Sequence, residues 1–115
     1  EDVQREIQTL SNRLNKIQGT VHHPDKHGSG DGGETNDYTN VSTAFNTYSV
    51  VWNEKAITFL VNDKPFHIVG NACALPFNWD FFLILNIAMG GTFGGSVPDS
   101  FVSDIMEVDY VRVYQ

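Results

Sequence analysis

The chain has 115 residues and a formal net charge of -7, and 41% of its residues are hydrophobic. This length provides for one hydrophobic core, so we expect one domain or part of one. An acidic surface repels phosphate groups, which disfavours nucleic acid and membranes as partners. No apolar run reaches the roughly 18 residues of a spanning helix. A neutral glycan is compatible with this composition, and the single cysteine, Cys73, has no partner for an internal disulfide.

Residues 1–18 have the spacing of an amphipathic helix. Apolar side chains recur at intervals of four and three at Val3, Ile7, Leu10, Leu14 and Ile17. No Pro or Gly interrupts the segment before Gly19, so the pattern predicts a helix of about five turns. Two heptads do not distinguish a helix that packs on the rest of the domain from one that joins chains into an oligomer.

After Gly19 the pattern changes to short strands and turns. Residues 20–23 are predicted to form a brief extended segment that ends at Pro24, and residues 25–40 a long polar loop rich in glycine. Asn40-Val41-Ser42, at the end of this loop, fits the glycosylation sequon, a short pattern that often arises by chance.

The middle of the chain is predicted to form three strands. Residues 45–52 alternate between two faces, as a strand with one more buried face does. Residues 56–61 and 65–69 flank the tight turn Asn62-Asp63-Lys64, which predicts a β-hairpin.

Two further strands are predicted towards the end of the chain. Residues 81–91 are almost uniformly apolar and favour a strand buried on both faces, in which Asn86 needs a hydrogen-bond partner or a ligand. Phe93 follows in a loop between glycine pairs, where it fits a ligand platform as well as a plug. Residues 104–115 alternate as a last strand. Short strands with Gly-rich turns predict a β-sandwich.

Two polar clusters invite a metal hypothesis, but neither has a convincing ligand spacing. His22, His23 and His27 lack an acidic or cysteine partner, and Pro24 prevents the helix that would align His23 with His27. The acidic loop residues are Asp31, Glu34 and Asp37. Their spacing does not match the known calcium loop, so solvated charge is the better interpretation.

Four stretches, in order, carry the motifs of a known family. They are residues 47–52 (TYSVVW), 57–64 (ITFLVNDK), 82–91 (FLILNIAMGG) and 108–115 (VDYVRVYQ). Residues 15–24 (NKIQGTVHHP) also look like the family's segment just after its catalytic strand. From about residue 14 to its end, the chain resembles glycoside hydrolase family 16, and within it the laminarinase-type endo-β-1,3-glucanases.

The resemblance implies an all-β fold: an antiparallel jelly-roll (concanavalin-like) β-sandwich or half of one, with the predicted N-terminal helix in front. Residues 1–18 are then a helical or divergent segment, and residues 19–115 the β-sandwich region that resembles the family's C-terminal half. The resemblance also implies an extracellular protein, a β-glucan polysaccharide or oligosaccharide as ligand, and no cofactor for catalysis. Asp109 matches an acidic residue that binds a structural calcium in several family members.

The resemblance further implies site residues. His22, Asn86 and Phe93 fall where the family lines or borders its substrate cleft. Its retaining mechanism uses two carboxyl groups about 5 to 5.5 Å apart, supplied by the pattern Glu-x-Asp-x-x-Glu. In this chain Glu1 and Glu6 match the outer glutamates as the candidate catalytic pair, and Val3 replaces the central Asp. The register that starts at Gln4 loses both outer glutamates.

Three hypotheses follow for function. The first is a glycoside hydrolase that cleaves β-1,3-glucan with retention, or a piece of one. The second is a non-catalytic glycan-binding or structural module built from half a sandwich, as a homo-oligomer or with a complementing N-terminal half. The third is a fragment or chimera whose first residues are unrelated to the family.

Overall fold

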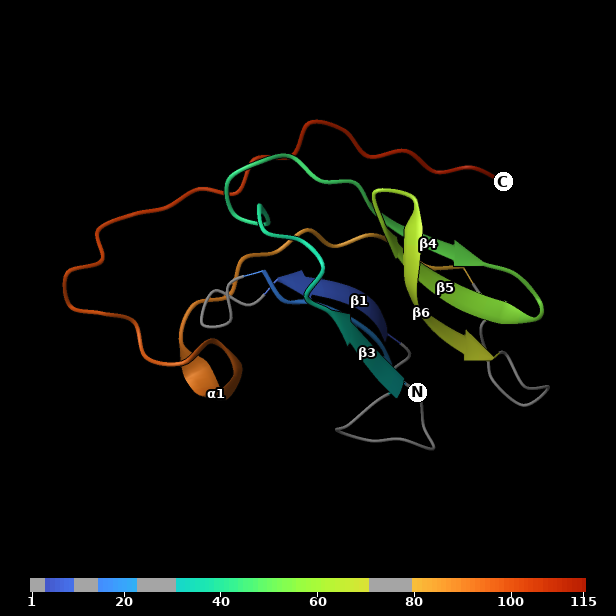
Figure 1. Ribbon diagram of the computed structural model, residues 1–115, viewed down its shortest axis with the longest axis horizontal. Coiled ribbons are helices and arrows are strands. Elements are labelled where there is room, and N and C mark those ends of the chain that lie inside the picture. Colours follow the sequence, from blue (N-terminus) through green and yellow to red (C-terminus); the bar gives the residue numbers. More distant parts are fainter. Residues whose placement is uncertain (1–3, 10–14, 23–30, 71–79) are drawn as a thin grey trace. The chain divides into compact units, whose positions relative to one another are not determined.

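The computed structural model of the chain describes residues 4–9, 15–22, 31–70 and 80–115 (Figure 1). For residues 4–9, Asp31, Phe93 and Gly94, only the backbone is described. The chain divides into two compact units, Glu1–Phe82 and Leu83–Gln115. Every strand in the described part of the chain belongs to the first unit.

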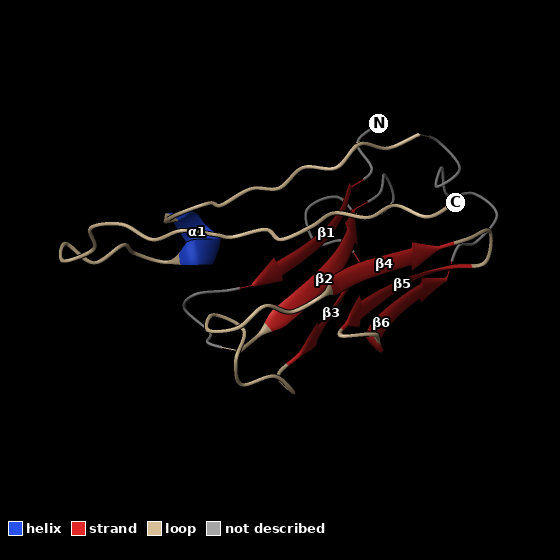
Figure 2. Ribbon diagram, turned by 90° about the horizontal axis from the view of Figure 1, so that it is seen from above, coloured by secondary structure: helices blue, strands red, loops and turns tan. Residues whose placement is uncertain are grey.

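The first sheet consists of β1 (Gln4–Thr9), β2 (Ile17–His22) and β3 (Asp31–Thr35), all antiparallel and in the order β1-β2-β3 (Figure 2). Part of the predicted 25–40 loop is thus a strand. Glycines have little β-propensity of their own, but β2 offers β3 a ladder of backbone hydrogen bonds, and tertiary pairing overrides the local preference.

The helix predicted over residues 1–18 is wrong where the structure can be compared with it. Gln4–Thr9 forms a strand, and its ladder with β2 runs from Gln4 opposite His22 to Thr9 opposite Ile17. Only Ile7 of the heptad positions falls inside β1. A short helix is marginal in water without a packed apolar face, so pairing with β2 prevails over the helical spacing. Residues 4–9 therefore form no helix that could join chains into an oligomer.

The second sheet consists of β4 (Tyr48–Trp52), β5 (Ala56–Val61) and β6 (Lys64–Gly70), in the order β4-β5-β6. It confirms the predicted strands and hairpin in this part of the chain. Asn62 and Asp63, at the tip of the hairpin, have φ angles of 49° and 64°. Positive φ at both central residues is what the two-residue hairpin turn requires, and Asn and Asp tolerate it better than other side chains.

The core lies between the two sheets. Alternate residues of β5 are completely buried, namely Ile57, Phe59 and Val61. Ile17 and Val21 of β2 are equally buried, and Val21 belongs to the same apolar cluster as Phe59. Strand alternation therefore places one face of each sheet against the other.

Two glycines of the first sheet lie against two rings of the second. A Cβ atom added to Gly19 would lie 2.7 Å from Cγ of Phe59, and one added to Gly33 would collide with the ring of His67. Gly19 and Gly33 are opposite each other in the β2–β3 ladder, as are Phe59 and His67 in the β5–β6 ladder. The two rings stack, with centroids 5.9 Å apart. We call these four residues the glycine–ring contact.

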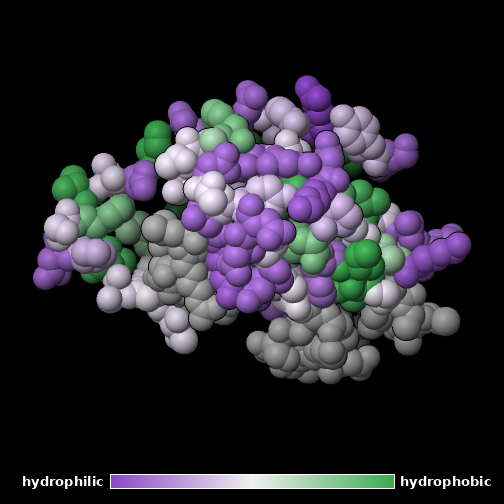
Figure 3. All heavy atoms as spheres, in the orientation of Figure 1, coloured by the Kyte–Doolittle hydropathy of each residue, from purple (hydrophilic) through white to green (hydrophobic). Residues whose placement is uncertain are grey.

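The second unit contains one helical turn, α1 (Gly91–Gly94), which is flanked by Gly90 and Gly95, both with positive φ. The strands predicted over 81–91 and 104–115 are not formed. Phe82, Leu83 and Ile84 are 84%, 67% and 72% exposed, so the run predicted to be buried is on the surface. Figure 3 shows that apolar residues, in green, reach the surface at several places in the view.

The physical reason is the lack of a ladder. A strand buried on both faces needs neighbouring strands for its N–H and C=O groups and apolar layers for its side chains. Neither accompanies residues 80–115 in the described structure. The all-β class with antiparallel sheets is nevertheless confirmed. In the described ranges, no helix is long and apolar enough to cross a membrane.

Candidate functional site

The candidate site is the polar face of the first sheet. Alternation along β2 sends one set of residues to the core, namely Ile17, Gly19 and Val21, and leaves the other set on the opposite side. The ladder fixes the neighbours of that second set. We define the polar face as Gln18, Thr20 and His22 of β2, Gly32 and Glu34 of β3, and positions Gln4, Glu6 and Gln8 of β1. No residue of this set is apolar apart from the glycine.

Hydrogen bonds and close packing order the middle of the polar face. The Gln18 side-chain amide donates to Oγ1 of Thr20 over 3.3 Å, and Thr20 is only 4% exposed. A Cβ atom at Gly32 would lie 3.2 Å from the Thr20 hydroxyl, so glycine leaves the room that this pair uses. Amide and hydroxyl groups held in this way have the donors and acceptors that sugar hydroxyls need.

An ion pair holds the far end of the polar face. Nζ of Lys16 lies 2.6 Å from Oε1 of Glu34, and the lysine side chain is only 13% exposed. Lys16, which directly precedes β2, thus holds the carboxylate of Glu34, the residue opposite Gln18 in the ladder. Asp37, the next acidic residue along, makes only a longer pair of 3.8 Å with Lys64 on the surface.

The fold brings two of the predicted site residues together. Glu6 lies opposite Thr20 in the β1–β2 ladder, and His22 ends β2 opposite Gln4. Positions 6 and 22 therefore belong to adjacent rows of the polar face. Glu1, the other predicted carboxylate, lies outside the described residues.

The remaining predicted site residues belong to the second unit. Asn86 is exposed and lies in no strand, so it does not fill the buried polar position that the sequence suggested. Phe93 lies in α1. The polar face is built from the first unit alone.

A calcium site at Asp109 does not fit the residues that the structure describes. Asp109 is exposed, and no group of three or more His, Cys, Asp or Glu residues that could hold a metal occurs in the described ranges. Hard cations such as calcium take six to eight oxygen ligands, which a lone exposed carboxylate does not provide. Of the three histidines considered for metal binding, His23 and His27 lie outside the described residues.

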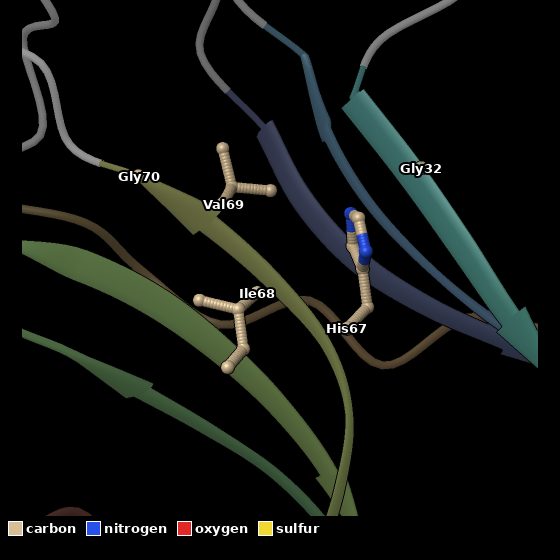
Figure 4. Close-up of a pocket in the computed structure, with 5 residues that line it drawn as sticks. All are labelled: Gly32, His67, Ile68, Val69 and Gly70. Atoms are coloured by element: carbon tan, nitrogen blue, oxygen red, sulfur yellow. The ribbon is translucent and has the colours of Figure 1, made fainter.

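A hollow of about 290 Å³ lies at the seam between β3 and β6 (Figure 4). Gly32 and residues 67–70 line it. In Figure 4 the imidazole of His67 extends from β6 towards the first sheet, where it meets Gly33. The sequence analysis did not single out His67. Its ring stacks on buried Phe59 of its own sheet and lies against Gly33 of the first sheet, so it packs at the contact between the two sheets.

Asparagine side chains connect the loop before β4 to the hairpin tip. The Asn62 amide donates to Oδ1 of Asn46 over 2.9 Å, and Oδ1 of Asn62 accepts from the Thr47 N–H over 2.9 Å. Next to this contact, partial burial raises the pKa of the Tyr48 hydroxyl, while its hydrogen bond with Asn46 acts in the opposite direction. This loop is therefore fixed to the second sheet.

Two antiparallel sheets that pack face to face through an apolar core define the class of β-sandwiches, which includes lectin domains. Within that class, residues 4–112 match the family described as glycosyl hydrolases family 16. The chain belongs to this family. The match includes all of β1, which the resemblance from residue 14 onward did not reach.

Several curated proteins are similar to the chain. A glucan endo-1,3-beta-glucosidase of Cryptopygus antarcticus is 31% identical over 119 residues, covering 87% of this chain and 44% of that protein. Glucan endo-1,3-beta-glucosidase A1 of Niallia circulans is 42% identical over 85 residues, covering 62% of this chain and 12% of that protein. The clotting factor G alpha subunit of Tachypleus tridentatus is 33% identical over 105 residues, covering 87% and 16%.

The chain thus spans less than half the length of each of these relatives. No solved structure matches it.

Proposed function

We propose that this chain is part of a glycoside hydrolase-like protein that acts on β-1,3-glucan, and that the polar face of the first sheet contacts the sugar. Two relatives carry the name of an endo-1,3-beta-glucosidase, which supports this ligand. The observation that carries the proposal is the register that puts Glu6 and His22 on the same face as the ordered Gln18–Thr20 pair. His22 is the proposed substrate-binding residue of this face, and the family resemblance proposes Asn86 and Phe93 as substrate-binding residues of the second unit.

The proposed reaction is hydrolysis with retention. One carboxylate attacks the anomeric carbon and forms a glycosyl-enzyme, while the other carboxylic acid protonates the leaving oxygen and then activates water. Glu6 is the proposed contribution of β1, since it is the acidic residue within Gln4–Thr9. The second carboxylate must come from outside β1, and Glu1 is the candidate that the sequence offers.

Binding without hydrolysis is the second candidate function. A specific observation favours it: β1 supplies one carboxylate where the two-carboxylate mechanism requires a pair, and Val3 replaces the central Asp of the pattern. One relative is named as a clotting factor subunit rather than a hydrolase, so family membership does not decide between the two functions.

Laminarin, a β-1,3-glucan, tests both candidates. The purified chain is assayed for release of reducing ends and, in parallel, for a change in melting temperature with laminarin oligosaccharides. Glu6→Gln is compared with Glu54→Gln, whose carboxylate lies exposed in the turn between β4 and β5. Release that Glu6→Gln abolishes and Glu54→Gln retains supports hydrolysis. A melting shift without release supports binding alone. The absence of both signals overturns the proposal.

We also propose an extracellular location and a protein partner for this chain. A second copy, or a complementing N-terminal half, would bury the exposed apolar residues of the second unit, such as Leu83 and Ile84. Sedimentation of the purified chain tests the first of these partners, because a monomer at all concentrations excludes the second copy.

A further inference from the structure

The loop between β3 and β4 carries a triplet that neither the fold nor the proposed glycan contact uses. Asn40, Val41 and Ser42 place a side-chain amide two residues before a hydroxyl, with a residue other than proline between them. The chain has ten asparagines, and this is its one Asn-x-Ser/Thr triplet. Such a triplet is the acceptor pattern for N-linked glycans and is used on exposed loops.

The structure presents the triplet in the required way. Asn40 and Ser42 are both exposed. The Asn40 carbonyl oxygen accepts from the N–H groups of Thr43, over 3.2 Å, and Ala44, over 3.1 Å, so the backbone forms a turn on the surface. The Asn40 side-chain amide makes no hydrogen bond to any described residue.

A neighbouring asparagine in the same loop shows the contrast. The Asn46 amide donates to the carbonyl of Ala44 over 3.2 Å, and its Oδ1 accepts from Asn62 over 2.9 Å. Asn46 is therefore structural, whereas the Asn40 amide projects from the turn without a role in holding it. A group attached at Asn40 would displace no contact of the described structure.

We propose that Asn40 is an N-glycosylation site when the chain passes through a eukaryotic secretory pathway, in keeping with the extracellular location proposed above. The donor is an oligosaccharide linked to a lipid diphosphate, and the host's transferase catalyses the step. Nδ2 of Asn40 forms a bond to C1 of the first sugar and loses one proton. The bond from C1 to the diphosphate oxygen breaks, and the lipid diphosphate leaves with that electron pair.

The test is secretion of the full chain from insect cells, with intact mass measured before and after peptide N-glycosidase F. We expect added glycan mass that the enzyme removes, leaving an aspartate at position 40. Asn40→Gln and Ser42→Ala should each lose the glycan. Ser42→Thr should retain it, and so should Asn36→Gln, which changes an exposed asparagine of the same loop outside the triplet.

An unmodified mass of the secreted chain overturns the proposal, as does a glycan that persists in Asn40→Gln. The intracellular pool is analysed in the same way, so poor secretion of a variant does not hide the answer. Chain made in bacteria carries no such glycan and serves for the laminarin assay. Failure of glucan binding and failure of glycosylation are therefore separate results.

Discussion

The first and second units contain equally strand-like sequence but differ in what that sequence forms. In β5, Ile57, Phe59 and Val61 are fully buried between strands and against a second sheet. Leu83 and Ile84, in an even more apolar run, are 67% and 72% exposed. The comparison shows that apolar, β-branched sequence is not sufficient for a strand. The neighbouring ladder and the facing layer decide the outcome.

The largest expected effect is the difference between truncating one large apolar residue in each unit. Phe59→Ala should lower the free energy of unfolding by about 3 to 5 kcal/mol, because it leaves a cavity between the sheets. Leu83→Ala should change it by no more than about 0.5 kcal/mol, since the side chain is exposed. Urea denaturation monitored by fluorescence measures both. Equal losses would mean that the two runs are buried alike.

A smaller effect is expected where the sheets approach each other. Gly19→Ala should cost about 1 to 3 kcal/mol, because its Cβ meets the Phe59 ring at 2.7 Å and the core must shift. Gly70→Ala is the matched control, since a Cβ there has nothing within 4 Å. Thermal unfolding of both variants distinguishes them. If Gly19→Ala kept the stability of the original chain, the Phe59 ring would not lie against position 19.

The hairpin tip should show a still smaller effect. Asn62→Ala removes the hydrogen bonds to Thr47 and Asn46 and puts alanine at a φ of 49°, so we expect a loss of about 1 to 2 kcal/mol. Asn62→Gly keeps the turn and removes only the hydrogen bonds, so it should lose less. Denaturant midpoints compare the two variants. Equal losses of stability would mean that alanine pays no cost for the positive φ at position 62.

The smallest effect is expected for ion pairs. Glu34→Gln should cost about 0.5 to 1 kcal/mol because the Lys16 partner is mostly buried, and the loss should shrink in high salt. Asp37→Asn, in a longer pair with both side chains exposed, should be close to neutral. Melting temperatures at two salt concentrations measure the difference. A larger effect for Asp37 would reverse the assignment of the two pairs.

Local signals predicted the second sheet well. The hairpin was readable because Asn62 and Asp63 suit positive φ and the flanking residues alternate, and both properties lie within a few neighbouring residues. The strand β1 was not readable, because the heptad spacing that suggested one helix runs through β1 and reaches Ile17, the first residue of its partner β2. For residues 81–91 and 104–115, the sequence indicates strand character but contains no information on whether a ladder is formed.

The candidate site was predicted only in part. The family motifs pointed to Glu6 and His22, and the register makes them neighbours on one face. Gln18 was missed because residues up to 18 were assigned to a helix, and Thr20 was predicted to be extended but was not singled out. The alternation of small or apolar residues with polar ones along β2 would have found both.

The glycine–ring contact means that positions 19, 33, 59 and 67 do not vary independently. A larger residue on one sheet must be matched by a smaller one on the other, because interiors have little free space. Loss of stability in Gly19→Ala should therefore be partly rescued by Phe59→Leu, although each change alone is unfavourable. In a set of related sequences, we expect these four positions to change together, because the distance between the two sheets limits their combined size.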